Sequence, residues 1–65
     1  MGSGFYAQLR VILLENGCAR VRHGKGSHEV WFSPITKRTF PISVTVNSRY
    51  TANEILKQAG IDKHF

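Results

Sequence analysis

The segment Lys25-Gly26-Ser27-His28 brings together residue types that can bind a phosphate group and move a proton. Glycines let backbone amides approach an anion closely, and a lysine adds a positive charge beside them. A histidine titrates near neutral pH, so it can take a proton from a hydroxyl group such as the ribose 2′-hydroxyl. The same residues are also typical of an inert hairpin turn, and their spacing alone leaves both interpretations open.

Other kinds of site are poorly supported by the sequence. Ser27 and His28 are neighbours, so on a strand their side chains would point to opposite faces and could not form a nucleophile and its base. Cys18 is the sole cysteine, which excludes an internal disulfide and predicts a small buried side chain. His23 and His28 flank a four-residue loop and could lie opposite each other on one face, but two imidazoles are an incomplete zinc site. We therefore expect no metal and no cofactor.

Composition bounds the class of protein. The chain has 65 residues, nine Lys and Arg against four Asp and Glu, and a formal net charge of +5. This size leaves room for one thin core, and the basic balance favours an anionic partner, with nucleic acid ahead of an acidic protein. No apolar run approaches the roughly 18 residues that span a membrane, and the single cysteine fits a reducing cytoplasm.

Two helices are predicted to flank the candidate segment. Residues 5–16 carry apolar side chains at helical spacing, and Gly17 follows at the position where a left-handed residue commonly ends a helix. These apolar residues are Phe5, Leu9, Val11, Ile12, Leu13 and Leu14. The second helix is predicted to begin at Thr51, which with Glu54 matches a capping box, and to end at Gly60.

Three strands are predicted between the helices, over residues 18–23, 28–33 and 38–46. Alternation of apolar and polar residues supports the first and the third, and aromatic content supports the second. Pro41 cannot donate a ladder hydrogen bond, so the third strand is expected at an edge of the sheet or with a bulge there.

The faces of these strands follow from the same alternation. In the first strand Ala19 and Val21 are expected to be half-buried, and Arg20 and Arg22 to give the strand a basic outer face. In the second strand, Trp31 and Phe32 are expected on opposite faces, one in the core and the other outside, and alternation does not choose between them.

The element order predicts an α+β fold, α-β-β-β-α, in which two helices cover one face of a three-stranded antiparallel sheet. The other face stays open to solvent or a partner. Residues 1–4, Met-Gly-Ser-Gly, look like an artificial leader or a disordered start. The predicted domain therefore spans 5–65.

The whole pattern resembles the HicA toxin family. The resemblance rests on the first helix ending at Gly17, on Lys25-Gly26-Ser27-His28, on Pro41 in the third strand and on the sequence Ile-Leu-Lys-Gln-Ala-Gly-Ile at 55–61. It implies a fold like that of the double-stranded RNA-binding domain and a toxin of a type II toxin–antitoxin system. Such toxins are mRNA interferases that a HicB antitoxin neutralises. The catalytic histidine of the family falls on His28, with Gly26 and Ser27 completing the motif. An aromatic residue of the family aligns with Trp31, which implies that Trp31 lies inside and that the outer face of the second strand carries Phe32, Val30 and His28.

The resemblance implies a metal-free mechanism with RNA as substrate. His28 would act as the general base, and Lys25, Gly26, Ser27 and Arg22 would contact the RNA. Family members often have a second histidine after the strand-three proline. Ser43 stands near that place, which lowers the expected efficiency unless His23 substitutes.

Two other interpretations remain open at this point. One is a non-catalytic RNA-binding module of the same fold, and the other is a basic interaction protein for an acidic partner.

Overall fold

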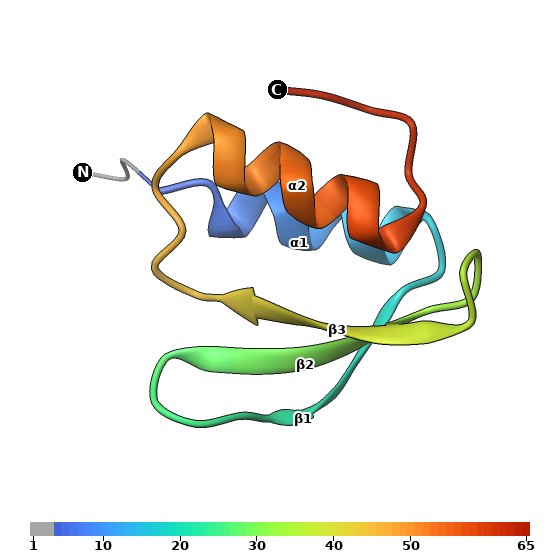
Figure 1. Ribbon diagram of the computed structural model, residues 1–65, viewed down its shortest axis with the longest axis horizontal. Coiled ribbons are helices and arrows are strands. Elements are labelled where there is room, and N and C mark those ends of the chain that lie inside the picture. The colour runs from blue at the N-terminus through green and yellow to red at the C-terminus, as the bar shows by residue number, and fades with distance from the viewer. Residues whose placement is uncertain (1–3) are drawn as a thin grey trace.

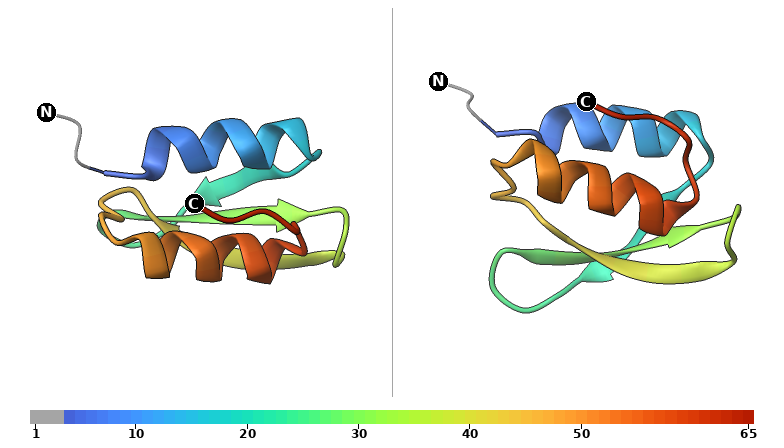
Figure 2. Two further views of the ribbon diagram at one scale, coloured as in Figure 1. Left: turned by 90° about the horizontal axis from the view of Figure 1, so that it is seen from above. Right: turned by 45° about the horizontal axis from the view of Figure 1, so that its top comes forward.

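The computed structural model describes residues 4–65, and its elements follow the predicted order (Figure 1). The elements are α1 Tyr6–Glu15, β1 Ala19–His23, β2 His28–Ser33, β3 Arg38–Ser43 and α2 Arg49–Ala59. The strands form one antiparallel sheet in the order β1-β2-β3, and both helices lie on the same face of it (Figure 2). The predicted α+β fold is confirmed. Of the predicted start, 1–4, only Gly4 lies within the described residues.

The core lies between the helices and the covered face of the sheet. Its largest fully buried apolar side chains are Trp31, Leu9, Leu13, Ile42 and Leu56. Burial of each such side chain contributes about 1.5–3 kcal/mol to folding, before the cost of ordering the chain. Trp31 points into this core and Phe32 is exposed, as predicted, and Cys18 is buried, as predicted. Burial raises the pKa of the Cys18 thiol.

The C-terminus of α1 is closed by a glycine motif. Gly17 has φ +85°, and its amide donates to the carbonyl of Leu14 at 3.1 Å while the amide of Cys18 donates to Leu13 at 2.9 Å. These two bonds are the Schellman pattern, which satisfies carbonyls that the helix end leaves unpaired. The predicted role of Gly17 is confirmed, and the motif turns the chain directly into β1.

The start of α2 differs from the prediction. Ser48, not Thr51, is the N-cap, because Ser48 has the extended backbone of a cap and its side chain accepts a bond from the Thr51 amide at 3.5 Å. Thr51 and Glu54 therefore lie inside the helix, and the predicted capping box is wrong. The predicted end is right, since Gly60 adopts a left-handed conformation with φ 80°.

The third strand is shorter than the predicted range 38–46. β3 ends at Ser43, whose side chain accepts a bond from the amide of Thr45 at 3.3 Å and turns the chain. Val46 is still buried, and its carbonyl accepts a bond from the Phe5 amide at 2.9 Å. Pro41 lies on β3, an edge strand, as predicted.

The first strand is not half-buried as predicted, because every residue of β1 is exposed. β1 is the other edge of the sheet, and its pairing with β2 is interrupted between Arg20 and Arg22. Arg20 pairs with Trp31 and Arg22 pairs with Val30, so Val21 is an extra residue in a β-bulge. The regular alternation of side chains between the two faces of the sheet is therefore interrupted at Val21.

Candidate active site

Two hydrogen bonds within the β1–β2 hairpin fix the backbone of His28, one through its amide and one through its carbonyl. The His28 amide donates to the carbonyl of Lys25 at 3.1 Å, and the His28 carbonyl accepts a bond from the Gly24 amide at 2.8 Å. The end of the loop is tied to the neighbouring strand as well, because the Val44 amide donates to the carbonyl of Ser27 at 2.9 Å. The first residue of β2 is therefore anchored within the hairpin and next to the end of β3.

The loop itself is open at Gly26. This residue has φ +62°, a left-handed conformation that favours glycine, and nothing lies within 4 Å of the position that a Cβ would take. Ser27 is half-buried beside it and Lys25 is exposed. The loop backbone can therefore be approached from solvent at the point where the sequence predicts an anion.

His28 lies on the open face of the sheet. Its neighbour Glu29 is buried on the helix side, and successive residues of a strand point to opposite faces. Ser43 of β3 is the direct partner of His28 in the ladder, so the two side chains share the open face. Ser43, which stands near the place where family members often have a second histidine, is thus directly across from His28.

The bulge at Val21 separates the two arginines of β1. Because Arg22 pairs with Val30, which alternation places on the open face, Arg22 shares this face with His28. Arg20 pairs with Trp31 and lies on the helix side. The prediction of a basic outer face on β1 is therefore right for Arg22 and wrong for Arg20.

His23 does not share a face with His28. In the ladder His23 is paired with Glu29, whose side chain is on the helix side. The expectation that the two histidines face each other across the loop is wrong, because the Gly24 amide bonds to the His28 carbonyl, so that His28 lies opposite Gly24 and Glu29 lies opposite His23.

A buried carboxylate lies directly behind this site. Glu29 accepts bonds from the Tyr6 hydroxyl at 2.8 Å and from Trp31 Nε1 at 3.0 Å, and its second oxygen accepts one from Arg20 Nη1 at 3.3 Å. Burial acts to raise the pKa of the Glu29 carboxyl, but these three hydrogen bonds outweigh it and hold the pKa below its ordinary value. Glu29 thereby connects α1, β1 and β2 behind His28.

This carboxylate network was not predicted from the sequence. One signal was present, since Glu29 and Trp31 are two residues apart on a strand and therefore share the inward face. An acid at an inward position requires partners.

A comparison with family models identifies the chain. The model described as HicA toxin of bacterial toxin-antitoxin matches residues 6–61, which include all five elements and the whole β1–β2 hairpin. The chain belongs to the HicA toxin family. Membership makes it a toxin of a toxin–antitoxin system, with a cognate antitoxin as its partner. No curated protein and no solved structure gives a significant match.

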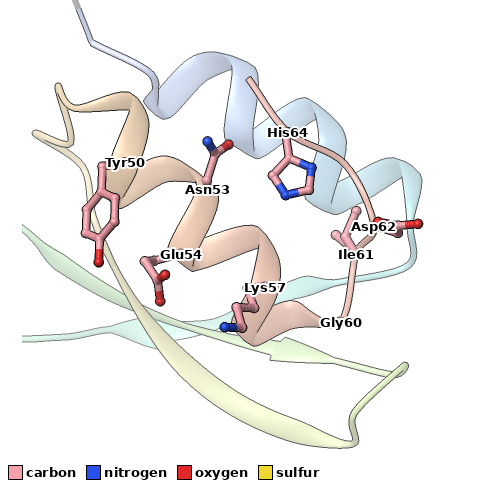
Figure 3. A pocket seen from close by; sticks show the side chains of 8 residues that line it. All are labelled: Tyr50, Asn53, Glu54, Lys57, Gly60, Ile61, Asp62 and His64. Carbon is pink, nitrogen blue, oxygen red and sulfur yellow. The ribbon is translucent and has the colours of Figure 1, made fainter.

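In this HicA family member a hollow between α2 and the C-terminal segment lies away from the hairpin (Figure 3). It is lined by Tyr50, Asn53, Glu54, Lys57, Gly60, Ile61, Asp62 and His64. Figure 3 shows Glu54 and Lys57 reaching out from α2 and His64 coming from the C-terminal segment. The residues predicted for the HicA site are on an open sheet face and its loop instead of in this hollow.

Two further findings concern metals and membranes. Within residues 4–65 of this HicA chain, no three side chains of His, Cys, Asp or Glu lie together in a way that could hold a metal ion. Neither helix of the same range has the length and apolar content needed to cross a membrane.

Proposed function

We propose that this HicA toxin is an endoribonuclease that cleaves mRNA without a metal ion, with His28 as the general base. The observation that carries the proposal is the placement of His28. It is exposed on the open face, its amide and carbonyl are both hydrogen-bonded within the hairpin, and the glycine loop beside it is accessible. An open face suits a polymer that must lie across it, whereas a small substrate would need a cavity.

The proposed reaction is a transesterification within the RNA. His28 takes the proton of a ribose 2′-hydroxyl, and the 2′ oxygen attacks the adjacent phosphorus atom. The bond from phosphorus to the 5′ oxygen of the next nucleotide breaks, and that oxygen takes up a proton from solvent. The products are a 2′,3′-cyclic phosphate and a free 5′-hydroxyl.

Charge builds up on the phosphate oxygens during this step, and the loop can offset it. The ammonium group of Lys25 and the backbone amides around Gly26 and Ser27 are the proposed donors, because the space over Gly26 is open to a phosphate. Arg22 is proposed to bind a neighbouring phosphate from the same face. The toxin would use one positioned base, a contribution of about 10²–10⁴-fold in rate.

The experiment that tests this function uses the purified chain and 5′-labelled RNA in excess EDTA, with analysis of the product ends. Cleavage that yields cyclic phosphate and 5′-hydroxyl ends supports the proposal. Salt-sensitive RNA binding without any product would replace it with a non-catalytic RNA-binding module. Absence of RNA affinity together with tight binding of the antitoxin would favour a basic interaction protein.

A further inference from the structure

An exposed aromatic ring lies on the same face of the sheet as His28, the face that both helices leave uncovered (Figure 2). Phe32 is 37% exposed and follows His28 by four positions along β2, so alternation places both side chains on this open face. At the rise of an antiparallel strand, the two positions are about 14 Å apart along β2. The proposed cleavage mechanism uses His28 and leaves the ring without a role.

Short side chains lie beside the ring on the neighbouring strands. Phe32 is paired with Ala19 of β1 and with Thr39 of β3, and all three residues are exposed. Residues paired across strands share a face, so the ring has a methyl group on one side and a small hydroxyl side chain on the other. Half-buried Val30 continues this uncharged surface toward His28. An aromatic ring on an open sheet is a surface on which the base of a nucleotide can stack.

The charges around this face suit a polyanion. Arg22 shares the face, and exposed Lys25 lies in the loop at the end nearest His28. The four acidic side chains of the chain are placed on or behind the helix side of the sheet or beyond it: Glu15 in α1, Glu29 buried under the helices, Glu54 in α2 and Asp62 after α2. Cations next to an aromatic ring are the combination that binds the phosphates and bases of a single-stranded nucleic acid.

We propose that Phe32 is a specificity-determining residue that stacks on an unpaired base of the RNA, so that the substrate is single-stranded on at least one side of the cleaved bond. The partner of Arg22 is Val30, which is two residues from His28 and two from Phe32. Arg22 would therefore bind a phosphate between the cleaved nucleotide and the stacked base. In a duplex the bases are paired and stacked on one another, so none of them is free to cover the ring. This inference rests on the proposed function, because it takes His28 to mark the cleaved nucleotide.

The test measures RNA affinity by fluorescence anisotropy in a His28→Ala background, after circular dichroism confirms the fold of each variant. The probes are an unstructured RNA oligonucleotide and the same oligonucleotide in a duplex with its complement. Phe32→Ala should weaken binding of the single strand by about tenfold, because the stack with one base is lost. Phe32→Leu should lose nearly as much, since leucine has no ring, and Phe32→Trp should retain the affinity. Binding of the duplex should change by less than about twofold in all three variants.

Two further measurements separate stacking from a general disturbance of the surface. The slope of log K against log salt concentration should be the same with and without the ring, because stacking releases no counterions. Tyr50→Ala is the matched control, because Tyr50 is an aromatic residue that is 75% exposed but lies on α2. Its affinity for the single strand should stay within about twofold of the parent His28→Ala chain.

Three results would overturn the inference. The first is Phe32→Ala binding the single strand within twofold of the parent chain, and if the variant had instead lost affinity for the antitoxin, the ring would be assigned to that partner. The second is an equal loss for single strand and duplex, and the third is absence of RNA affinity in the parent chain.

Cleavage by the toxin with His28 intact is measured separately, so that the two proposals can fail independently. Cleavage that is insensitive to Phe32→Ala, together with unchanged affinity, would leave the proposed function in place and remove the role of Phe32. Binding of single-stranded RNA that depends on Phe32 but gives no product would remove the proposed function and keep the stacking role.

Discussion

The Tyr6 hydroxyl donates to Glu29 at 2.8 Å, and this bond joins α1 to the strand residue next to His28. Trp31 and Arg20 complete the set of donors around the same carboxylate. A buried charge with three donors is favourable only as a set, because removing the charge leaves the donors with a weaker acceptor. These bonds join α1, β1 and β2 behind the candidate site.

Glu29→Gln should lower the free energy of unfolding by about 1–3 kcal/mol. The amide keeps the shape of the side chain, but it removes the charge and places an NH₂ group toward Arg20 or the other donors. Urea denaturation followed by circular dichroism measures the change. A loss below about 0.5 kcal/mol would show that the network contributes little.

The stabilisation from Glu29 should disappear in acid. Its pKa is lower in the folded chain than the ordinary value of 4.5 that it has when unfolded, so the unfolded chain binds the proton first. The stabilisation is present in full above the unfolded pKa and is lost as the pH falls through the folded pKa. The difference in unfolding free energy between the unaltered chain and Glu29→Gln should therefore shrink between about pH 5 and pH 2. A difference that is constant over this range would contradict the assignment.

Arg22→Ala should weaken binding of single-stranded RNA and make its salt dependence shallower. Loss of one phosphate contact reduces the slope of log K against log salt concentration by about 0.7. Fluorescence anisotropy in a His28→Ala background measures binding without cleavage. Arg20→Ala is the matched control, because Arg20 is on the helix side of the bulge, and an equal change of slope in both variants would mean that the two faces do not differ in RNA contact.

Ser43→His should raise the rate of RNA cleavage. Ser43 is the ladder partner of His28, so an imidazole there would lie across from the base and could protonate the leaving 5′ oxygen. We expect an increase of about tenfold, at the low end of what a positioned acid contributes, since no other group has been arranged to orient it. Initial rates over pH 5–8 measure the effect, and an unchanged rate with an intact fold would speak against acid catalysis from this position.

Much of the fold could be predicted because the local sequence patterns agree with the way the elements pack. The left-handed conformations of Gly17 and Gly60 and the edge position of Pro41 each follow from a single residue type in its local context, whereas the inward Trp31 follows from the family resemblance. The start of α2 was predicted wrongly because local sequence is ambiguous there. Ser48 and Thr51 are both good caps, and choosing between them depends on where the chain leaves β3.

The candidate site was only partly predictable. The loop Lys25-Gly26-Ser27-His28 is contiguous, so the sequence places its members together. The bulge at Val21 cannot be predicted from the alternation of residues. Arg20 and Arg22 are spaced as if they shared one face of the sheet, but they lie on opposite faces. The bond from Tyr6 to Glu29 spans 23 residues, and only the packing of α1 on the sheet brings its two ends together.

The role of His28 as the general base is tested most directly by a comparison of His28→Ala with His23→Ala. Both residues are exposed histidines at the ends of the same hairpin, but they lie on opposite faces of the sheet. The initial rate of RNA cleavage in EDTA should fall by about 10²–10⁴-fold for His28→Ala and stay within about twofold for His23→Ala. Equal rates for the two variants, or a larger loss for His23→Ala, would contradict the account.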